Sequence, residues 1–509
     1  VTEEQIKDFS CLCYEAYSGG RIDAYVYGFS KKGWYSDIAS AYIYYISKLL
    51  DLRDSTMTTG TGEPPRLENS YCLIRGDVNI PENVGYHSLT IKHLTNLDTN
   101  IRAVGEYRAS YTLNERDFLI ERGATFKNET WYNIETDGSL SPIAQVMLDF
   151  TALRYKLLAE GNSAEFMVKK ASASGYGILF EATNEYEEND QFEVERIGYR
   201  GGEFLNALYA CIITSEVRLM TARAESSIVK NGGTPTLVMT DAVFWEGTAD
   251  MIDPELVRAT KTLGYFESPV EIRDVAYLGT GRYSYTDAKK GRVTTKNRGL
   301  NISAIHDADG IPMDTYDWND ALKLAEKTNS FKIDVKVRTL VSVGMVLGSV
   351  NDIYDKSGNL IREAYTVKDL GLIDEVNREV DIITGLTKRV LDEEIKDVKQ
   401  LTRGIVTTSP LYIGRGMFPS QELEDQTLPK LREEVMKQEF KSAKTKDRKN
   451  RSKASMKYAT DNKESINETL RLKYAFCKDM GYKRNDCKKM SKWSWERIYN
   501  IHSGKEEIR

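Results

Sequence analysis

Apolar and polar residues alternate over 21–28 (RIDAYVYG), a pattern typical of a half-buried strand. The sequence SKKG at 30–33 predicts a turn, and WYSDIAS directly after it predicts a second strand. Asp37 is therefore expected near the end of a strand in a hairpin. Residues 40–52 fit a helix, whereas the turn-rich segment 53–70 is expected to be irregular.

Helical periodicity is strongest in the middle of the chain. Residues 142–161 (PIAQVMLDFTALRYKLLAEG) have apolar positions at helical spacing and end on a glycine. A second helix is predicted from Ser163 to about Ser174. A turn at Gly161 and Asn162 would then join two antiparallel helices.

Later in the chain the pattern changes to strands and then to helices. Residues 236–245 (TLVMTDAVFW) form an apolar strand that Thr240 and Asp241 interrupt at its centre. A charged residue inside such a run costs free energy unless it binds something. Alternation over 277–302 predicts further sheet, and the pattern from about residue 318 onward is mainly helical.

The composition is that of a soluble globular protein, with 41% hydrophobic and 29% charged residues. A chain of 509 residues is expected to contain roughly three or more packing units. No run of about 18 apolar residues would span a membrane, and the polar start predicts no secretion signal. The absence of an initiator Met predicts a processed or truncated product. Six sparse cysteines without a CxxC pair favour a reducing setting, in the cytoplasm or elsewhere inside a host cell.

Charge is distributed unevenly along the chain. The net charge is −6, yet residues 441–492 are strongly basic and include KTKDRKNRSK. The segment 441–509 predicts short amphipathic helices with Lys and Arg on one side. Contact with DNA phosphates is one interpretation of this segment, and a basic linker with a small helical cap is the other.

Two aspartates carry the candidate chemistry. Asp37 could simply cap a helix, and Asp241 could be a hairpin-turn residue. Alternatively, both carboxylates and the backbone carbonyl of Ile38 could bind divalent cations. Nucleotidyl transfer needs two metal ions about 4 Å apart, one at the primer 3′ hydroxyl and one at the triphosphate. Two aspartates on neighbouring strands are the minimum protein frame for such a site.

Two further segments could bind nucleotide or DNA. On a helix, Lys169 and Tyr176 share one face, so the lysine could hold a triphosphate while the tyrosine meets the base pair. Gly19 and Gly20 let the backbone approach a strand closely, and the nearby Tyr17 can stack on a base. The ordinary interpretations are a solvated lysine on an amphipathic helix and a plain turn before a strand.

The order of these segments resembles that of family B DNA polymerases. Over about 270 residues the chain has AYSGGRIDAYVYG, DIASAY, KKASASGYG, MTDAVFW and RYSY. The family has a YxGG segment, motif A (DxxSLYP), motif B (KxxxNSxYG), motif C (DTDS) and a KxY-like segment in the same order. The resemblance implies that Asp37 and Asp241 hold two Mg2+ ions, or Mn2+ as a substitute, and that Tyr42 is the steric gate against a ribose 2′ hydroxyl. It implies nucleotide binding by Lys169, Tyr42, Tyr176, Arg154 and Lys156, and DNA binding by Tyr17, Gly19, Gly20, Arg282 and Tyr283.

The motifs also depart from the family pattern. The departures are Ile43 for the motif A Pro, Ala173 for the motif B Asn, Met239 and Ala242 for the first Asp and the Ser of motif C, and Gly281 for the Lys of the KxY-like segment. Because Met239 leaves the Asp37–Asp241 pair intact, catalytic activity is still expected.

The resemblance implies an α+β fold shaped as a right hand. It has a palm with an antiparallel sheet, helical fingers and a mostly helical thumb, with inserted subdomains and a basic helical C-terminal extension. The predicted boundaries are 1–50 for the start of the palm, 51–141 for a first insertion, 142–178 for the fingers, 179–225 for a second insertion and palm, 226–317 for the palm with motif C, 318–440 for the thumb and 441–509 for the extension.

The spacing of the motifs resembles the protein-primed branch of the family. The 132 positions from Asp37 to Lys169 and the 72 from Lys169 to Asp241 leave room for the two subdomains that this branch inserts. The implied partners are a DNA template and primer, deoxynucleoside triphosphates and a terminal priming protein, in the replication of viral, phage or plasmid DNA. No membrane partner is expected.

The exonuclease domain usual in this family is expected to be absent, upstream of Val1 or on another chain, because only 16 residues precede Tyr17. The segment from Asn133 to Asp137 resembles the exonuclease DxET segment. It follows motif A and its first Asp is Asn133, so it is interpreted as a loop.

Three other functions remain open. A non-catalytic or weakly active family B-like subunit that binds DNA in a replication complex fits Met239, although the retained Asp37 and Asp241 argue against it. A reverse transcriptase would need a YxDD-type segment, which LVMTDA does not supply. A primase-like enzyme is disfavoured by Tyr42.

Overall fold

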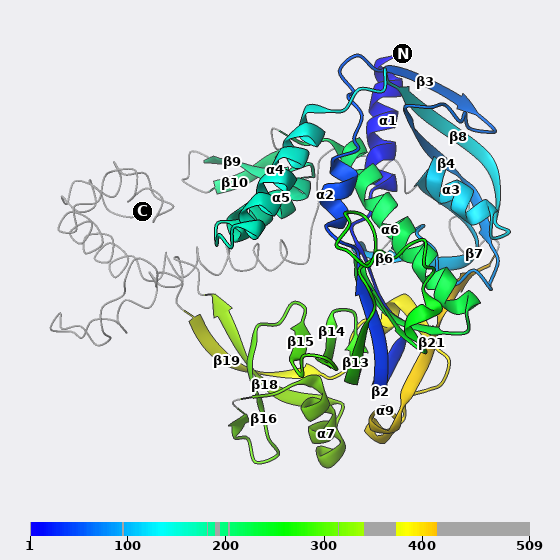
Figure 1. Ribbon diagram of the computed structural model, residues 1–509. Coiled ribbons are helices and arrows are strands. Elements are labelled where there is room, and N and C mark those ends of the chain that lie inside the picture. Colours follow the sequence, from blue (N-terminus) through cyan, green and yellow to red (C-terminus); the bar gives the residue numbers. More distant parts are fainter. Residues whose placement is uncertain are drawn as a thin grey trace, which may run out of the picture.

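The computed structural model describes residues 2–93, 96–180, 182–188, 194–201, 204–313, 315–340 and 373–414. Its largest element is a mixed sheet of 13 strands, against which a long helix packs (Figure 1). The fold class is therefore α+β. Within the described ranges, no helix combines the length and the apolar character needed to cross a membrane.

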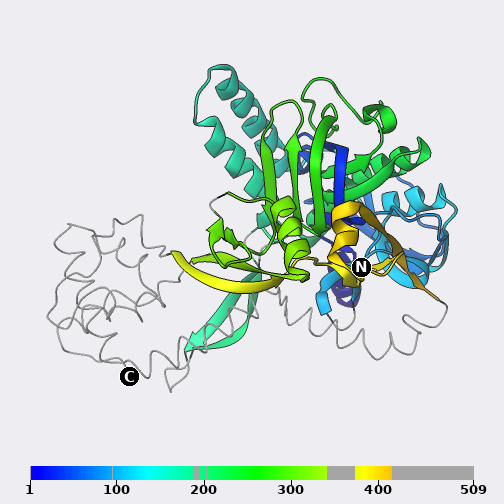
Figure 2. The ribbon, with the colours of Figure 1, turned by 90° about the horizontal axis from the view of Figure 1, so that it is seen from below.

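The first half of the sheet is built around β2 (Val26–Asp37), which pairs with three other strands. One neighbour is β12 (Ala242–Glu246), the second strand of a hairpin, and another is β13 (Val270–Gly279) (Figure 2). All these pairs are antiparallel. The remaining strands of this half are β1 (Arg21–Ala24), β11 (Thr234–Thr240), β14 (Arg282–Asp287) and β15 (Val293–Asn297).

A strand from late in the chain joins this half to the second half of the sheet. β21 (Ile405–Ile413) pairs antiparallel with β2 at one end and parallel with β7 (Ala103–Thr112) at the other. The second half has its own apolar core, which includes Ile74, Tyr107 and Phe118. Its other elements are β3 (Thr56–Thr61), β4 (Ser70–Ile80), β8 (Thr125–Glu135) and α3 (Leu113–Ile120).

The helix α6 (Ala207–Lys230) binds the two halves together. Asn206 begins it by accepting a hydrogen bond from the Tyr209 amide at 3.0 Å. Leu219 packs in the core of the second half, whereas Ala224 and Ile228 pack in that of the first. At 24 residues, roughly 36 Å, the helix is long enough to span both cores.

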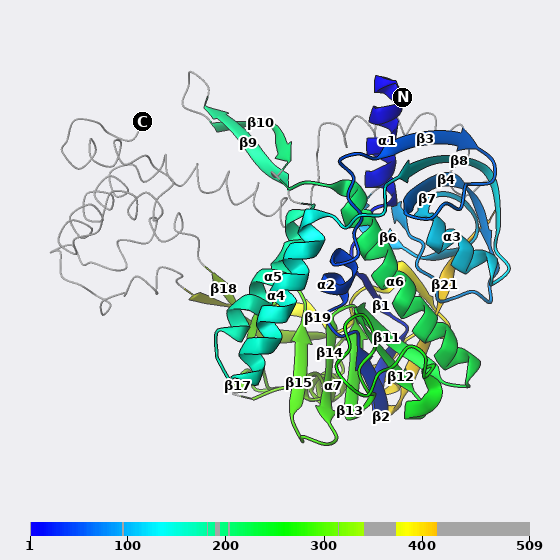
Figure 3. The same cartoon turned by 45° about the horizontal axis from the view of Figure 1, so that its top comes forward.

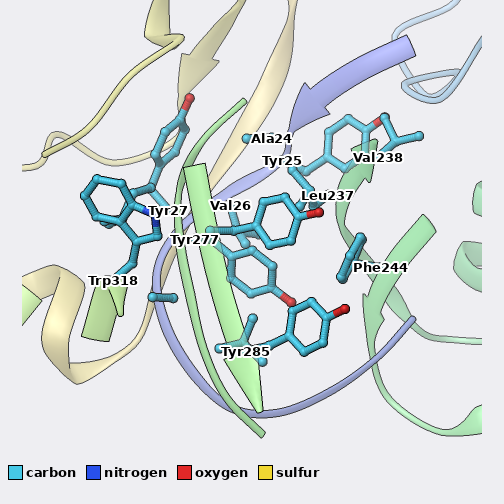
Figure 4. Close-up of a cluster of buried hydrophobic side chains, with 14 of the residues drawn as sticks. Ala24, Tyr25, Val26, Tyr27, Leu237, Val238, Phe244, Tyr277, Tyr285 and Trp318 are labelled. Carbon is cyan, nitrogen blue, oxygen red and sulfur yellow. The ribbon is translucent and has the colours of Figure 1, made fainter. Parts of the chain in front are cut away.

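The core of the first half contains several large aromatic side chains (Figure 4). Trp245, Trp318 and Tyr277 are almost completely buried. Buried tyrosine and tryptophan need a hydrogen-bond partner for their polar atom, and here the Trp318 indole N–H donates to the Lys296 carbonyl at 3.0 Å. This dense core fixes the strands that carry both candidate aspartates.

Two antiparallel helices stand beside the sheet. α4 (Pro142–Ala159) begins at Ser141, whose side chain accepts from the Ala144 amide, and α5 (Glu165–Ile178) follows after a turn. Figures 1 and 3 show this hairpin on the opposite side of α1 and α6 from β3, β4 and β8. The nearby hairpin of β9 (Ala182–Glu188) and β10 (Val194–Gly201) follows it in the chain.

The remaining elements are short or form a smaller sheet. The four-stranded sheet contains β16 (Ile302–His306), β17 (Pro312–Met313), β18 (Lys332–Leu340) and β19 (Ile373–Asp381). The other elements are α1 (Glu3–Ala16), α2 (Ala41–Ile46), α7 (Trp318–Thr328), α9 (Val398–Arg403), β5 (Ile91–His93), β6 (Asn96–Ile101), β20 (Arg389–Leu391) and the 3-10 turns Ala249–Met251 and Leu386–Lys388.

The predicted helical hairpin over 142–174 and the interruption of the strand at Asp241 are confirmed. The turn predicted at 30–33 is wrong, because β2 continues through it with β13 as its partner. Pairing with a distant strand overrides the local turn signal. The helix predicted over 40–52 is shorter, and the segment 53–70 contains the strand β3.

The prediction of a mainly helical region from about residue 318 is wrong for the described residues. Residues 318–340 and 373–414 contain the helices α7 and α9, but also the strands β18, β19, β20 and β21. β21 lies in the large sheet, so it does not belong to a separate helical thumb. The predicted extension 441–509 lies outside the described residues, and the right-hand arrangement of subdomains stays a prediction.

Candidate active site

Asp37 and Asp241 lie beside each other at the same end of the large sheet. Asp37 is the last residue of β2 and pairs with Ala242, the first residue of β12. The Ile38 amide donates a hydrogen bond to the Asp241 carbonyl at 2.9 Å. Two aspartates separated by 204 positions in the sequence are therefore held side by side, one at the end of β2 and one in the turn directly before β12.

A tight turn holds Asp241 in place. The Asp241 amide donates to the Met239 carbonyl at 2.8 Å, across Thr240, whose φ is 64°. Such a three-residue turn is rare because a β-branched residue at positive φ is strained. Strain of this kind is kept mainly where a side chain must be held in a fixed position. Here it places the Asp241 carboxylate at the tip of the β11–β12 hairpin.

The two carboxylates repel each other. Surrounding protein and then the Asp241 charge raise the pKa of Asp37, even though the Asp37 side chain keeps a solvent-exposed surface. Burial raises the pKa of Asp241, which is half-buried. Glu267, whose amide donates to the Asp37 carbonyl at 2.9 Å, adds further negative charge near Asp37.

This pair fits a divalent cation. Among the described residues, neither aspartate carboxylate forms an ion pair with Lys or Arg within 4.0 Å, so their charges are not neutralised by a close cation. The Lys261 ammonium binds Glu267 instead, at 3.0 Å. Carboxylate oxygens at an accessible strand end suit Mg2+, which binds through one or two carboxylates and leaves positions for water and phosphate. In the described part of the chain, no set of three acidic, His or Cys side chains forms an alternative metal site.

Tyr42 lies next to the aspartates, one residue into α2. Burial and then the Asp241 charge raise the pKa of its hydroxyl. Gly20 lies directly against this side chain, because a Cβ at position 20 would come within 2.7 Å of the Tyr42 hydroxyl and 2.6 Å of Thr240 Cγ2. By contrast, a Cβ at Gly19 would meet no atom within 4 Å. The close approach that the paired glycines predicted is therefore made by Gly20, and the group it approaches is Tyr42.

Tyr176 connects the α4–α5 hairpin to the site. Its ring lies 4.7 Å from the Tyr42 ring, and its hydroxyl shares a 2.7 Å hydrogen bond with the Tyr17 hydroxyl. Tyr17 in turn stacks on Phe180, with ring centroids 3.7 Å apart. Tyrosines from three separate sequence segments thus meet above the strand ends. Tyr17, predicted to contact DNA, is here half-buried within the protein.

The residues predicted to bind the triphosphate lie in different environments. Lys169 is exposed on α5, two turns and roughly 10 Å before Tyr176, and forms no ion pair with a described residue. Arg154 donates to Glu165 at 2.8 Å and reaches the hydroxyl of Ser40 at 3.5 Å. Ser40 is three residues after Asp37 in the sequence. Lys156 is exposed about 200° around α4 from Arg154, so the two side chains do not share a face.

The KxY-like segment lies behind the site rather than at its surface. Tyr283 is buried in β14, where it packs edge-on against Phe244. The Arg282 guanidinium is also buried and donates to the Asp381 and Ile382 carbonyls. Its placement therefore gives no support to the predicted contact with DNA.

Sequence reasoning missed a buried ionic network beneath the Gly19–Gly20 turn. Arg21 forms an ion pair with Glu225 of α6, and the Tyr25 hydroxyl donates to the same carboxylate at 2.7 Å. Arg218, also of α6, donates to the Ser18 carbonyl just before the glycines. The only signal in the sequence was charged residues within a largely apolar helical segment. This network fixes the turn that supports Tyr42.

No protein-family model matches the chain, and no curated protein matches its sequence. Among solved structures, the chain is similar to Phi29 DNA polymerase in an orthorhombic crystal form, with 14% identity and a TM-score of 0.42 over 62% of this chain and 55% of that chain. It is also similar to Phi29 DNA polymerase complexed with primer-template DNA and incoming nucleotide substrates, with 13% identity and a TM-score of 0.45 over 62% and 65% of the two chains. The chain thus matches between about half and two thirds of the length of these polymerases. Likeness at this level concerns the path of the backbone and does not identify the residues of the site.

Proposed function

We propose that the chain is a DNA-directed DNA polymerase, which transfers deoxynucleotides to a primer 3′ hydroxyl and releases pyrophosphate. The observation that carries the proposal is the pairing of Asp37 and Asp241 at one sheet end, with no close cation among the described residues. Two such carboxylates are the minimum protein frame for nucleotidyl transfer by two metal ions. The adjacent Tyr42 and Tyr176 come from the other segments that the family motifs predict.

The carboxylates of Asp37 and Asp241 and the Ile38 carbonyl would hold two Mg2+ ions, or Mn2+, which supply charge neutralisation at the triphosphate and lower the pKa of the primer hydroxyl when bound. Asp37 and Asp241 must be ionised for this, so their raised pKa values favour activity at neutral to alkaline pH.

The neighbouring residues would position the substrates. Lys169 has an exposed ammonium for the negative charge of the triphosphate, and the Arg154 guanidinium at Ser40 is a second candidate for the same role. The Tyr42 ring, held by Gly20 and Tyr176, would lie under the sugar and exclude a 2′ hydroxyl.

The narrower proposal is a protein-primed enzyme of family B. Its support is the arrangement of the inserted segments, since residues 51–141 form most of a separate half-sheet and the β9–β10 hairpin follows the α4–α5 hairpin. A terminal priming protein and a separate exonuclease chain are the partners that this proposal adds to template, primer and deoxynucleoside triphosphates.

Primer extension on a defined DNA template with Mg2+ and all four deoxynucleoside triphosphates tests the proposal. Asp37→Asn and Asp241→Asn should each reduce extension by at least about 1,000-fold, because metal-held charge at the reacting phosphate is worth several kcal/mol. Asp54→Asn, at an exposed position away from the site, should extend like the wild type.

If the wild type binds DNA but does not extend an oligonucleotide, the result has two explanations, a requirement for a protein primer or an absence of catalysis. Extension from the hydroxyl of an added terminal protein would establish protein priming. No extension under either condition would overturn the proposed catalysis and favour a non-catalytic DNA-binding subunit, the function that Met239 at the first position of motif C would fit.

A further inference from the structure

A cavity of about 560 Å3 lies beside α2. It is open to solvent on one side and is lined by α2, β4, α3, α6 and the segment between residues 256 and 265. The volume is in the range of sites that hold a small organic molecule. None of the residues in the candidate active site lines it.

Aromatic rings form much of the wall of the cavity. Tyr44 and Tyr45 come from α2, Tyr71 from β4 and Tyr265 from the 256–265 segment. Several of these rings are held in position: Gly264 packs directly against the Tyr44 ring, and the Tyr71 hydroxyl accepts from the Leu50 amide at 2.7 Å. Fixed tyrosine rings offer stacking surfaces for a planar ligand, such as a nucleobase.

Two cations also line the cavity, where both lie near enough to Glu216 to lower the pKa of its carboxyl group. Lys48, two residues after the end of α2, and Arg223 of α6 are exposed, and in the described part of the chain neither forms an ion pair within 4.0 Å. The Lys48 ammonium donates to the Tyr44 hydroxyl and lies 4.2 Å from the centroid of the Tyr44 ring. Two cations at the accessible part of a cavity suit an anionic group, and guanidinium and ammonium groups both bind phosphate.

The inner wall carries groups that can hydrogen-bond the edge of a base. The Asn114 side chain donates to the Glu216 carboxylate, and both residues line the cavity. Burial raises the pKa of Glu216, while the Asn114 hydrogen bond and the Arg223 charge lower it. A carboxyl group beside an amide presents acceptors and N–H donors, as the Watson–Crick edge of a nucleobase requires.

We propose that this cavity is a second nucleotide site, which binds a phosphorylated nucleoside with its base among the tyrosine rings and its phosphate at Lys48 and Arg223. The base edge faces Asn114 and Glu216. The ligand is either a free nucleotide or one nucleotide of a single strand, since both have the same chemistry.

The cavity is separate from the metal site but structurally linked to it. The Gly264 amide donates to the Ala39 carbonyl and the Ala39 amide donates to the Tyr265 carbonyl, each at 2.9 Å. Ala39 is two residues after Asp37, so one short segment forms part of both sites. On α2, Tyr44 lies about 200° around the helix from Tyr42 and Tyr45 about 60° from it, so both sites adjoin this helix.

Equilibrium dialysis with radiolabelled deoxyadenosine 5′-monophosphate in EDTA tests the proposal. The protein carries Asp37→Asn and Asp241→Asn, which removes nucleotide binding at the metal site. The result for the cavity is then independent of whether the chain is a polymerase. One nucleotide should bind per chain. Arg223→Gln and Lys48→Gln should each weaken binding about tenfold, whereas Lys230→Gln, an exposed position on α6 away from the cavity, should not change it.

Competition identifies the ligand. Inorganic phosphate and deoxyadenosine should each compete at least about tenfold less well than the monophosphate, because each occupies only part of the cavity. If a deoxyadenosine trinucleotide competes better than the monophosphate, the ligand is one nucleotide of a single strand. If the two compete equally, the ligand is a free nucleotide. Absence of nucleotide binding, binding insensitive to Arg223→Gln and Lys48→Gln, or equal competition by inorganic phosphate would each overturn the proposal.

Discussion

Gly20 lies so close to Tyr42 that a Cβ at position 20 would come within 2.7 Å of the Tyr42 hydroxyl. The same Cβ would come within 2.6 Å of Thr240, the strained residue before Asp241. Gly20→Ala should therefore displace Tyr42 or the β11–β12 turn. We expect a loss of about 1–3 kcal/mol in unfolding free energy, as for overpacking in a core, together with reduced primer extension.

Gly19→Ala is the matched control for this change. A Cβ at position 19 meets no atom within 4 Å, so its unfolding free energy should stay within about 0.5 kcal/mol of the wild type. Denaturant unfolding measured on both variants checks the pair. Equal stability of the two alanine variants would show that Gly20 is not in contact with Tyr42.

The aspartate pair predicts how stability depends on pH without metal. Both carboxyl groups have pKa values in the folded state above their values in the unfolded state. Their contribution to the free energy of unfolding is therefore fully present below about pH 4 and is lost as pH rises through the raised pKa values. In EDTA, Asp37→Asn should therefore raise the melting temperature at pH 8 by about 1–3 °C, and by less at pH 5. Thermal unfolding at the two pH values provides the measurement.

Divalent cations should reverse this effect in the wild type. Mg2+ binds the ionised carboxylates, so it should raise the wild-type melting temperature more at pH 8 than at pH 5 and should stabilise Asp37→Asn less. Asp54→Asn, exposed and away from the site, should respond like the wild type. A stabilisation by Mg2+ that is independent of both pH and Asp37 would place the metal elsewhere.

The position of Tyr42 predicts how the chain discriminates between deoxyribose and ribose in the incoming nucleotide. Its ring is held beside Asp241 by Gly20 and Tyr176, so a smaller side chain should open space for a 2′ hydroxyl. Tyr42→Val should raise ribonucleotide relative to deoxynucleotide incorporation roughly tenfold or more. Tyr42→Phe keeps the ring and should keep the discrimination. Single-nucleotide incorporation kinetics compare the variants, and unchanged selection in Tyr42→Val would exclude the gate.

Local signals in the sequence were enough to predict the α4–α5 hairpin. Ser141 caps the first helix, Pro142 begins it, and Gly161 takes the left-handed conformation in the turn, with a φ of 64°. The turn expected at 30–33 failed because β2 takes partners more than 200 positions later in the chain. The local pattern of apolar and polar residues does not reveal strand partners that are so far away in the sequence. The joining of the two half-sheets by β21 could not be predicted for the same reason.

In the candidate site, too, some residues could be predicted from the sequence and others could not. Asp37, Asp241, Tyr42 and Tyr176 could be selected because their segments follow the order of known motifs, and these segments meet in the structure. The position of Arg282 could not be predicted, since the carbonyls that it binds are about 100 positions away.

Glu225 should be essential for stability, because it is buried and shares an ion pair with Arg21 and a hydrogen bond with Tyr25. Glu225→Gln removes the negative charge and leaves the Arg21 guanidinium without its closest partner. Breaking a buried pair in this way should cost about 3–5 kcal/mol in unfolding free energy. Glu68→Gln, at an exposed position, should cost less than about 0.5 kcal/mol. Denaturant unfolding measures both, and a small effect in Glu225→Gln would contradict the buried network.

The hydrogen bond between Tyr17 and Tyr176, 2.7 Å long, joins the Gly19–Gly20 segment to the α4–α5 hairpin. Tyr17→Phe and Tyr176→Phe each remove one hydroxyl and keep the ring, so stacking on Phe180 and contact with Tyr42 should persist. A double-mutant cycle in unfolding free energy should give a coupling of about 1 kcal/mol. The same cycle in the rate of nucleotide incorporation would report whether this contact is also made during synthesis. Additive effects in both measurements would show that the hairpin does not dock through this contact, whereas coupling in both would identify it as the link that positions Tyr176 beside Tyr42.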